Sequence, residues 1–408
     1  MRKGIIIPEG LERLLALRAF GAETRAGPGP RRLPKRMLGR TAAAMLELSD
    51  RFNRIDESLG ADYMESPQHR AAYLAYFLPA NFAKTRAVLA ELAPTLAGRE
   101  ALTILDAGSG PGSMSLAALE TFGAQPGIRR LDFTAMDTSR AALDDYDSLT
   151  RRRAEDMSRE AGAPEVTLTT SVTDLETAAF AERRWDLILM GDTLNELFRG
   201  TENPVAARAA FLEGLAANLA EDGALVVIEP SLKSITRRLQ AVRDAVASSE
   251  ALHVRAPCLR RGGCPMLSEG RERDWCHTGA LWMRPPVVRR IDKAAGRGKF
   301  ILKFSHLVIR RRDEPPAAAP AGMTAFRAVG DMRREKGKFR IMLCGEPGCE
   351  MATLLKRDVN DRTRAFTAVE RGDVVALDSW ADRKDGRRLS ADTAVDILRR
   401  YNRTEAPG

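Results

Sequence analysis

The run from Leu102 to Gly112 reads LTILDAGSGPG and contains residues whose spacing could bind a ligand. A short apolar stretch ends in Asp106, and Gly108, Gly110 and Gly112 follow at every second position. Such glycines let a ligand approach bare backbone beside the start of a helix. The spacing differs from the dinucleotide fingerprint G-x-G-x-x-G, and Asp106 would repel a pyrophosphate. The motif therefore favours a ligand that carries a positive charge.

Two further acidic residues follow apolar runs that are typical of buried strands. Asp137 ends the run 131–137, and Asp174 lies just beyond the run 166–170. Open α/β sheets bind ligands at the carboxyl ends of their strands. We expect Asp137 to accept hydrogen bonds from ribose hydroxyls and Asp174 to contact an adenine ring.

The cysteines form a second group of potential ligands, because all five lie between residues 258 and 349. Cys258, Cys264 and Cys276 are separated by five and eleven residues, without the paired knuckles of zinc ribbons. This irregular spacing is compatible with an iron–sulfur cluster, but it leaves zinc open. On spacing alone, a fourth ligand could be His277 or one of the two remaining cysteines. These are Cys344 and Cys349.

The elements that must position these residues follow from the apolar pattern. Between 101 and about 250 the sequence alternates strand and helix, which predicts a parallel sheet covered by helices. Residues 1–100 read as a helical N-terminal extension, and a linker rich in Pro and Ala precedes a small β-rich module at 324–380. One amphipathic helix with a loose tail is expected over 381–408. The predicted domains are therefore 1–100, 101–312 with the cysteine segment 256–285 inside it, 324–380 and 381–408.

The charge favours a polyanionic partner. The 64 Lys and Arg exceed the 55 Asp and Glu and give a formal net charge of +9. Because two basic groups neighbour the cysteines, we expect folding to gather them on one phosphate-binding surface. The first comprises Arg284, Arg289, Arg290, Lys293, Arg297, Lys299, Lys303, Arg310, Arg311 and Arg312, and the second Arg333, Arg334, Lys336, Lys338 and Arg340. An N-terminal arm adds Arg25, Arg31, Arg32, Lys35, Arg36 and Arg40, and an aromatic group expected to serve packing comprises Tyr63, Tyr73, Tyr76, Phe77 and Phe82.

Membrane insertion and export are not expected. No run of eighteen apolar residues is present, and the N-terminal apolar run breaks after three residues, too early for a signal peptide. We expect a cytoplasmic protein.

The glycine motif, with acids at successive strand ends, resembles the first motif of class I S-adenosylmethionine-dependent methyltransferases. The chain also resembles the mitochondrial small-ribosomal-subunit methyltransferase-like family and its bacterial relatives. The matching runs are 257–265, 274–277, 303–310 and 73–79. The resemblance implies a class I (Rossmann-like) α/β methyltransferase fold, an S-adenosylmethionine pocket, contact with small-subunit ribosomal RNA and a 4Fe–4S cluster. The implied ligands are Cys258, Cys264, Cys276 and Cys344, with Cys349 an extra cysteine.

The end of the predicted fourth strand limits the chemistry. Methyltransferases that act on exocyclic amines often carry an Asp- or Asn-Pro-Pro-aromatic turn there, whereas this chain has Asp192-Thr-Leu-Asn195. Those that act on a pyrimidine ring carbon need a nearby cysteine, and none lies in the first five predicted strands. The sequence therefore supports cofactor binding more than catalysis and assigns no catalytic residue. We expect a methyltransferase-like factor of small-subunit assembly that contacts rRNA, with rRNA methylation as a candidate activity. The alternatives are a non-catalytic rRNA-binding factor and a small-molecule methyltransferase with structural zinc.

Overall fold

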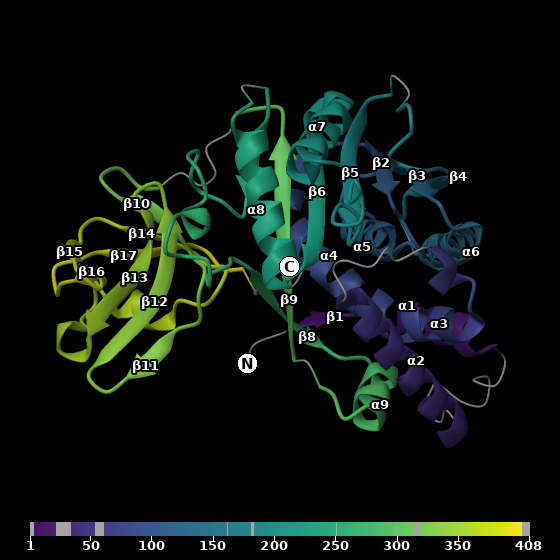
Figure 1. Ribbon diagram of the computed structural model, residues 1–408, viewed down its shortest axis with the longest axis horizontal. Helices are drawn as coiled ribbons and strands as arrows, with labels where there is room; N and C mark the ends of the chain where they lie inside the picture. Colours follow the sequence, from purple (N-terminus) through teal and green to yellow (C-terminus); the bar gives the residue numbers. More distant parts are fainter. Residues whose placement is uncertain are drawn as a thin grey trace.

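The computed structural model describes residues 4–21, 34–53, 61–160, 162–180, 183–249, 251–298, 300–313 and 319–401. Two β-sheets organise these residues, one of nine strands and one of eight (Figure 1). The larger sheet carries helices on both faces, and the smaller sheet forms the C-terminal module beside α8 and β9.

The N-terminal extension is helical, as expected. Ser66 accepts a hydrogen bond from the amide of His69 and so caps the helix that begins at Pro67. A π-helical turn, Tyr73–Phe77, joins this helix to the next. The elements are β1 (Ile5–Ile6), α1 (Glu9–Phe20), α2 (Lys35–Asn53), α3 (Pro67–Ala72) and α4 (Leu78–Leu92). Short 3₁₀ turns span Ala61–Met64 and Ala93–Leu96.

The central region alternates strand and helix, and each of its five predicted strands is present. The first half contains β2 (Ala101–Ala107), α5 (Ser113–Phe122), β3 (Arg130–Asp137), α6 (Arg140–Met157), β4 (Glu165–Val172) and β5 (Trp185–Gly191). The second half contains α7 (Pro204–Ala217), β6 (Leu219–Pro230), α8 (Lys233–Ala247), β7 (His253–Ala256), β8 (Thr278–Met283), α9 (Pro286–Ala294) and β9 (Ile301–Arg310). A 3₁₀ turn, Pro265–Leu267, lies between β7 and β8.

The strand order of the larger sheet is β1-β8-β9-β6-β5-β2-β3-β4, and its ninth strand, β7, pairs with β9. The strands from β2 to β6 pair in parallel, and β9 then pairs with β6 in the antiparallel sense. Strand order reverses between β2 and β5, and open α/β sheets bind ligands at such a switch point. This arrangement is the class I methyltransferase fold, so the fold prediction is confirmed.

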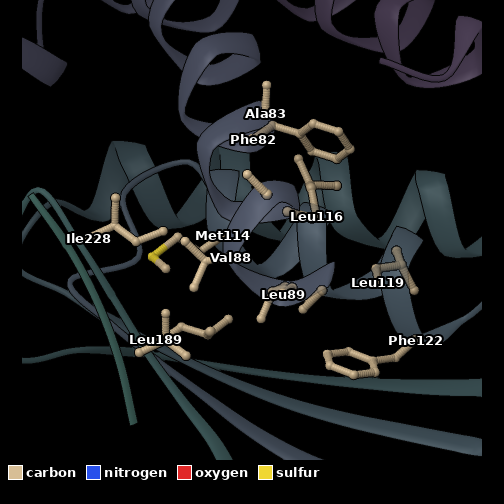
Figure 2. Packing of buried hydrophobic residues seen from close by; sticks show 14 of the residues in the cluster. Phe82, Ala83, Val88, Leu89, Met114, Leu116, Leu119, Phe122, Leu189 and Ile228 are labelled. Carbon is tan, nitrogen blue, oxygen red and sulfur yellow. The ribbon is translucent and has the colours of Figure 1, made fainter. Parts of the chain in front are cut away.

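Apolar packing holds α4 and α5 against one face of the sheet (Figure 2). Phe82 and Leu89 of α4 meet Leu116 of α5, while Leu189 and Ile228 contribute from β5 and β6. All of these side chains are nearly or fully buried, and each contributes about 1.5–3 kcal/mol to folding. The packing fixes the start of α5, and therefore the glycine turn that precedes it.

The C-terminal module has its own core, and it corrects one prediction. Residues 381–399 form three strands, so the helix expected over 381–408 is wrong where the structure describes it; residues 402–408 lie outside the described ranges. Leu389 and Val395 bury their side chains in the module, and tertiary pairing outweighs local helix propensity. The strands are β10 (Thr324–Ala328), β11 (Arg333–Glu335), β12 (Lys338–Gly345), β13 (Gly348–Leu355), β14 (Val374–Leu377), β15 (Ala381–Arg383), β16 (Gly386–Leu389) and β17 (Val395–Arg399). Short 3₁₀ turns span Lys356–Asp358 and Arg364–Ala368.

Candidate functional site

A cavity of about 300 Å³ opens at the carboxyl edge of the parallel strands. The glycine turn after β2 and the segments after β3, β4 and β5 line it, and α2, α4 and the π-helical turn close it from the N-terminal extension. The cavity therefore lies at the switch point of the strand order.

Asp137 links the end of β3 to the glycine turn. One carboxylate oxygen accepts a hydrogen bond from the amide of Gly110 at 2.8 Å, and the other accepts from the amide of Ser139 at 2.9 Å. Burial raises the pKa of Asp137, and these backbone donors oppose the shift. Asp174 also lines the cavity, just beyond β4. The structure thus brings together Asp137, Asp174, Gly108 and Gly110 from the predicted set.

The three glycines have different roles. Gly110 has φ +50°, and a Cβ atom there would meet only the Tyr73 hydroxyl, at 4.0 Å, so its surface faces open space. A Cβ atom on Gly108 would lie 2.4 Å from the Thr193 side chain, and one on Gly112 would lie 2.7 Å from the Tyr146 ring. Gly112 does not line the cavity and serves packing instead.

Asp106 does not face the cavity. It is 1% exposed, and one carboxylate oxygen accepts hydrogen bonds from the hydroxyl and the amide of Ser115, at 2.7 and 3.1 Å. Burial raises its pKa to about 7. In this structure one oxygen of Asp106 fixes the start of α5, and the other is buried with no hydrogen-bond partner among the described residues.

Charged groups after β5 were not assigned from the sequence. Asp192 has φ +56°, an unusual conformation for a residue other than glycine, and it lines the cavity with Lys84 and Glu196. Burial raises the pKa of Glu196 to about 7. Near the end of β6, the buried Glu229 accepts hydrogen bonds from the backbone and side chain of Asn195. Burial raises the pKa of Glu229 to about 8. In the sequence, the position of Asp192 directly after β5 was the only sign that these residues line the cavity. No sequence feature indicated Lys84.

The aromatic group divides between packing and the cavity wall. Tyr63, Tyr73 and Phe77 line the cavity with Phe52, and the Tyr73 and Phe77 rings stack with centroids 5.9 Å apart. Phe82 is fully buried and packs in the core, as expected. The group therefore packs against the core as expected, and three of its five members also line the cavity.

A second cavity is lined by Cys258, Cys264, Cys276 and Cys344. The first three lie between β7 and β8, and Cys344 comes from β12 of the C-terminal module. Cys349 does not line this cavity. It is buried in β13, directly opposite Cys344 of β12.

Three arginines and an aspartate hold the cysteine loops in place. Arg243 of α8 donates to the carbonyls of Arg260 and Gly262, and Asp244 accepts from the amide of Cys264 at 2.9 and 3.0 Å. Arg237 donates to three carbonyl groups of the loop between Cys264 and Cys276. Arg271 donates to the Cys349 carbonyl at 3.0 Å and ties this loop to the module. These contacts anchor the cysteine-bearing segments to α8 and to the C-terminal module.

The surroundings of the four thiols suit an anionic group. Nitrogen atoms of four side chains around this cavity are buried, with no hydrogen-bond partner among the described residues. They belong to Arg243, Arg327, His277 and His306. A thiolate-ligated cluster is anionic and would accept such donors, so these residues fit it. In the described ranges, no three His, Cys, Asp or Glu side chains are gathered as the ligands of one metal ion are. The metal centre stays a prediction.

The basic groups do not form one surface. Arg310 is 1% exposed and donates to the carbonyls of Asp222 and Gly223, so it supports the fold and cannot contact phosphate. Arg284 precedes α9, which packs on α2, whereas Arg312 lies past the opposite end of β9. That strand of ten residues separates the two ends by roughly 30 Å. The prediction of a single surface is therefore wrong. Lys299 and, in the N-terminal arm, Arg25, Arg31 and Arg32 lie outside the described residues.

The cavity at the switch point and the strand order define a protein of the class I methyltransferase fold. More specifically, the chain belongs to the family described as mitochondrial small ribosomal subunit Rsm22, whose model matches residues 67–374. No curated protein matches the chain. In the described ranges, the helices are too short or too polar to cross a bilayer.

Several solved structures are similar to the chain at low sequence identity. The plantazolicin methyltransferase BpumL in complex with SAH is 13% identical, with 67% of this chain and 99% of that chain covered and a TM-score of 0.33. Mitomycin 7-O-methyltransferase MmcR is 14% identical, with 73% and 74% covered and a TM-score of 0.34. An S-adenosylmethionine-dependent methyltransferase from Clostridium acetobutylicum ATCC 824 is 8% identical, with 76% and 87% covered and a TM-score of 0.28.

Proposed function

We propose that this protein binds S-adenosylmethionine in the switch-point cavity and acts in small ribosomal subunit assembly through contact with ribosomal RNA. The observation that carries the proposal is the Asp137 carboxylate, which is fixed by the Gly110 amide at the edge of an open cavity. A carboxylate at this strand end suits a ribose diol, and Asp174 lies one strand further along, where it would meet the adenine ring. Family membership supports the ribosomal part of the proposal.

The charge of the cavity also supports this ligand. Asp137, Asp174, Asp192 and Glu196 line it, and Lys84 is the one basic residue among the described residues that do so. S-adenosylmethionine carries a sulfonium and an ammonium group against one carboxylate, and its net positive charge suits an acidic cavity.

The four cysteines around the second cavity are proposed to hold a 4Fe–4S cluster. Cys258, Cys264, Cys276 and Cys344 would supply its thiolates, and zinc on the same thiolates is the alternative. When bound, the cluster would supply a covalent link between the cysteine loops and the C-terminal module, so its binding energy would become folding energy. Iron and sulfide analysis of protein purified without oxygen separates the cluster from zinc.

Methyl transfer to ribosomal RNA is a second candidate function, and Glu196 favours it. Its carboxylate lines the cavity, and its pKa of about 7 suits a group that accepts a proton from an attacking amine or hydroxyl at neutral pH. In the alternative, a non-catalytic factor, Glu196 would have no such role.

Calorimetry on Gly110→Arg tests the proposed function. An arginine at Gly110 should fill the open space beside Asp137 and abolish S-adenosylmethionine binding. Gly127→Arg is the matched control, because Gly127 also has a positive φ, +98°, and a Cβ atom added there would meet nothing within 4 Å. Equal binding by both variants, or no binding by the wild type, would contradict the proposal. Transfer of labelled methyl groups to small-subunit RNA, lost in Glu196→Gln with cofactor binding retained, would establish the second candidate.

A further inference from the structure

Lys84 and Asp192 form a pair of opposite charges in the wall of the switch-point cavity. The Lys84 ammonium lies 3.8 Å from one Asp192 carboxylate oxygen, a loose contact, and donates to the Asn81 side chain at 2.8 Å. The other Asp192 oxygen is buried and has no hydrogen-bond partner among the described residues. A lysine ammonium has three donors, so Lys84 also keeps bonding capacity. Each member of the pair can therefore bind a further charged group.

The fold fixes this pair at a set distance from Asp137. Asp192 follows β5 and Asp137 ends β3, with β2 and its glycine turn between them. Neighbouring strands lie about 4.8 Å apart, so the pair lies roughly 10 Å along the sheet edge from the proposed ribose site. Thr193 donates from its hydroxyl to the Gly108 carbonyl at 3.2 Å and holds the end of β5 against the glycine turn.

We propose that Lys84 and Asp192 bind the amino-acid end of S-adenosylmethionine, Lys84 its carboxylate and Asp192 its ammonium. The assignment rests on the proposed function, because the adenosine must lie at Asp137 for the amino-acid end to reach β5. A zwitterion presents adjacent charges of both signs, and a loosely paired lysine and aspartate present the complementary two. Asp106, the acid expected to meet the ammonium, accepts from Ser115 through one oxygen and does not line the cavity.

The assignment makes the N-terminal extension part of the cofactor site. Lys84 belongs to α4, whereas Asp192 belongs to the central sheet, so the zwitterion would join the two. Binding of the amino-acid end should therefore depend on α4, and binding of the adenosine should not.

Truncated ligands test the assignment through calorimetry on the full-length protein. Methylthioadenosine keeps the adenosine and lacks the amino-acid end, and decarboxylated S-adenosylmethionine lacks only the carboxylate. The variants are Lys84→Met and Asp192→Asn, because asparagine tolerates the positive φ of this position as aspartate does. Lys338→Met is the matched control, since Lys338 pairs with Glu335 at 3.3 Å on the C-terminal module.

Lys84→Met should weaken S-adenosylmethionine binding by roughly 10- to 100-fold, the effect of one lost charge-assisted hydrogen bond, and leave the decarboxylated ligand unaffected. Asp192→Asn should weaken both, and all variants should bind methylthioadenosine as the wild type does. Equal losses for methylthioadenosine would overturn the assignment, because the pair would then act only through the fold. Unchanged S-adenosylmethionine binding in both variants would also overturn it. If the wild type bound neither ligand, the proposed function would fail together with this assignment.

Discussion

Removing the carboxylate of Glu91 should release the C-terminal module from the methyltransferase domain. Glu91 lies near the end of α4 and is 9% exposed. It accepts hydrogen bonds from Arg327 of β10 at 2.7 Å and from Arg399 of β17 at 2.8 Å. Arg327 also donates to the Gly372 carbonyl, so one carboxylate holds two strands of the module.

The free energy at stake follows from the pKa of Glu91. Burial alone would raise that pKa, but the two arginines outweigh burial and lower it from 4.5 to about 2. A shift of this size corresponds to about 3 kcal/mol of folding free energy at pH 7. Because the folded-state pKa is depressed, this contribution is complete above pH 4.5 and is lost as the pH falls towards 2. At pH 3 it should amount to about 1.5 kcal/mol.

Glu91→Gln should therefore lower the free energy of unfolding by about 3 kcal/mol at pH 7, and by roughly half as much near pH 3. Leaving Arg327 buried without a charged partner adds to the loss at both values. Urea unfolding across this pH range measures the difference, and hydrogen exchange reports whether the amides of β10–β17 lose protection together. Glu120→Gln is the control, because it breaks a partly buried pair with Arg153 inside the methyltransferase domain. A difference between wild type and Glu91→Gln that stayed constant from pH 7 to pH 3 would refute the reasoning. Equal hydrogen-exchange protection of the module amides in Glu91→Gln and Glu120→Gln would refute it as well.

Three further predictions concern the cysteines and the basic residues. Cys344→Ser should lose iron and expose the C-terminal module to proteolysis. Cys349→Ser should keep its iron and its resistance to proteolysis, because Cys349 does not line the cysteine cavity. Full iron and sulfide in anaerobically purified Cys344→Ser would contradict the ligand set. Neutralising Arg333, Arg334 and Lys336, which are exposed on and beside β11, should weaken binding to small-subunit RNA and reduce the salt slope by up to roughly three. Arg310→Met should lower stability with no change in that slope, since its guanidinium binds backbone carbonyls; a flatter slope in Arg310→Met would show that it reaches phosphate after all.

The sequence was sufficient for the local features of the fold and of the switch-point cavity. Apolar runs and the acids that end them located the five parallel strands, because strand formation and its termination depend on neighbouring residues. Gly108, Gly110, Asp137 and Asp174 meet in one cavity because the carboxyl ends of parallel strands share one edge of the sheet. The cysteine positions, together with the family resemblance, also separated Cys344 from Cys349, as the cavity lining does.

Only the tertiary structure decided which of these residues face a ligand. Asp106 and Gly112 belong to the same motif as Gly110, but their contacts with Ser115 and Tyr146 depend on where α5 and α6 pack. Lys84 lies far along the chain from Asp192, and only the folding of α4 over the sheet edge brings the two together. Residues 381–399 form strands because β14 and β13 offer them backbone partners. A sequence pattern reports on one segment, whereas the pairing of β16 and β17 with their neighbours joins distant segments, so the pattern of 381–399 alone did not reveal it.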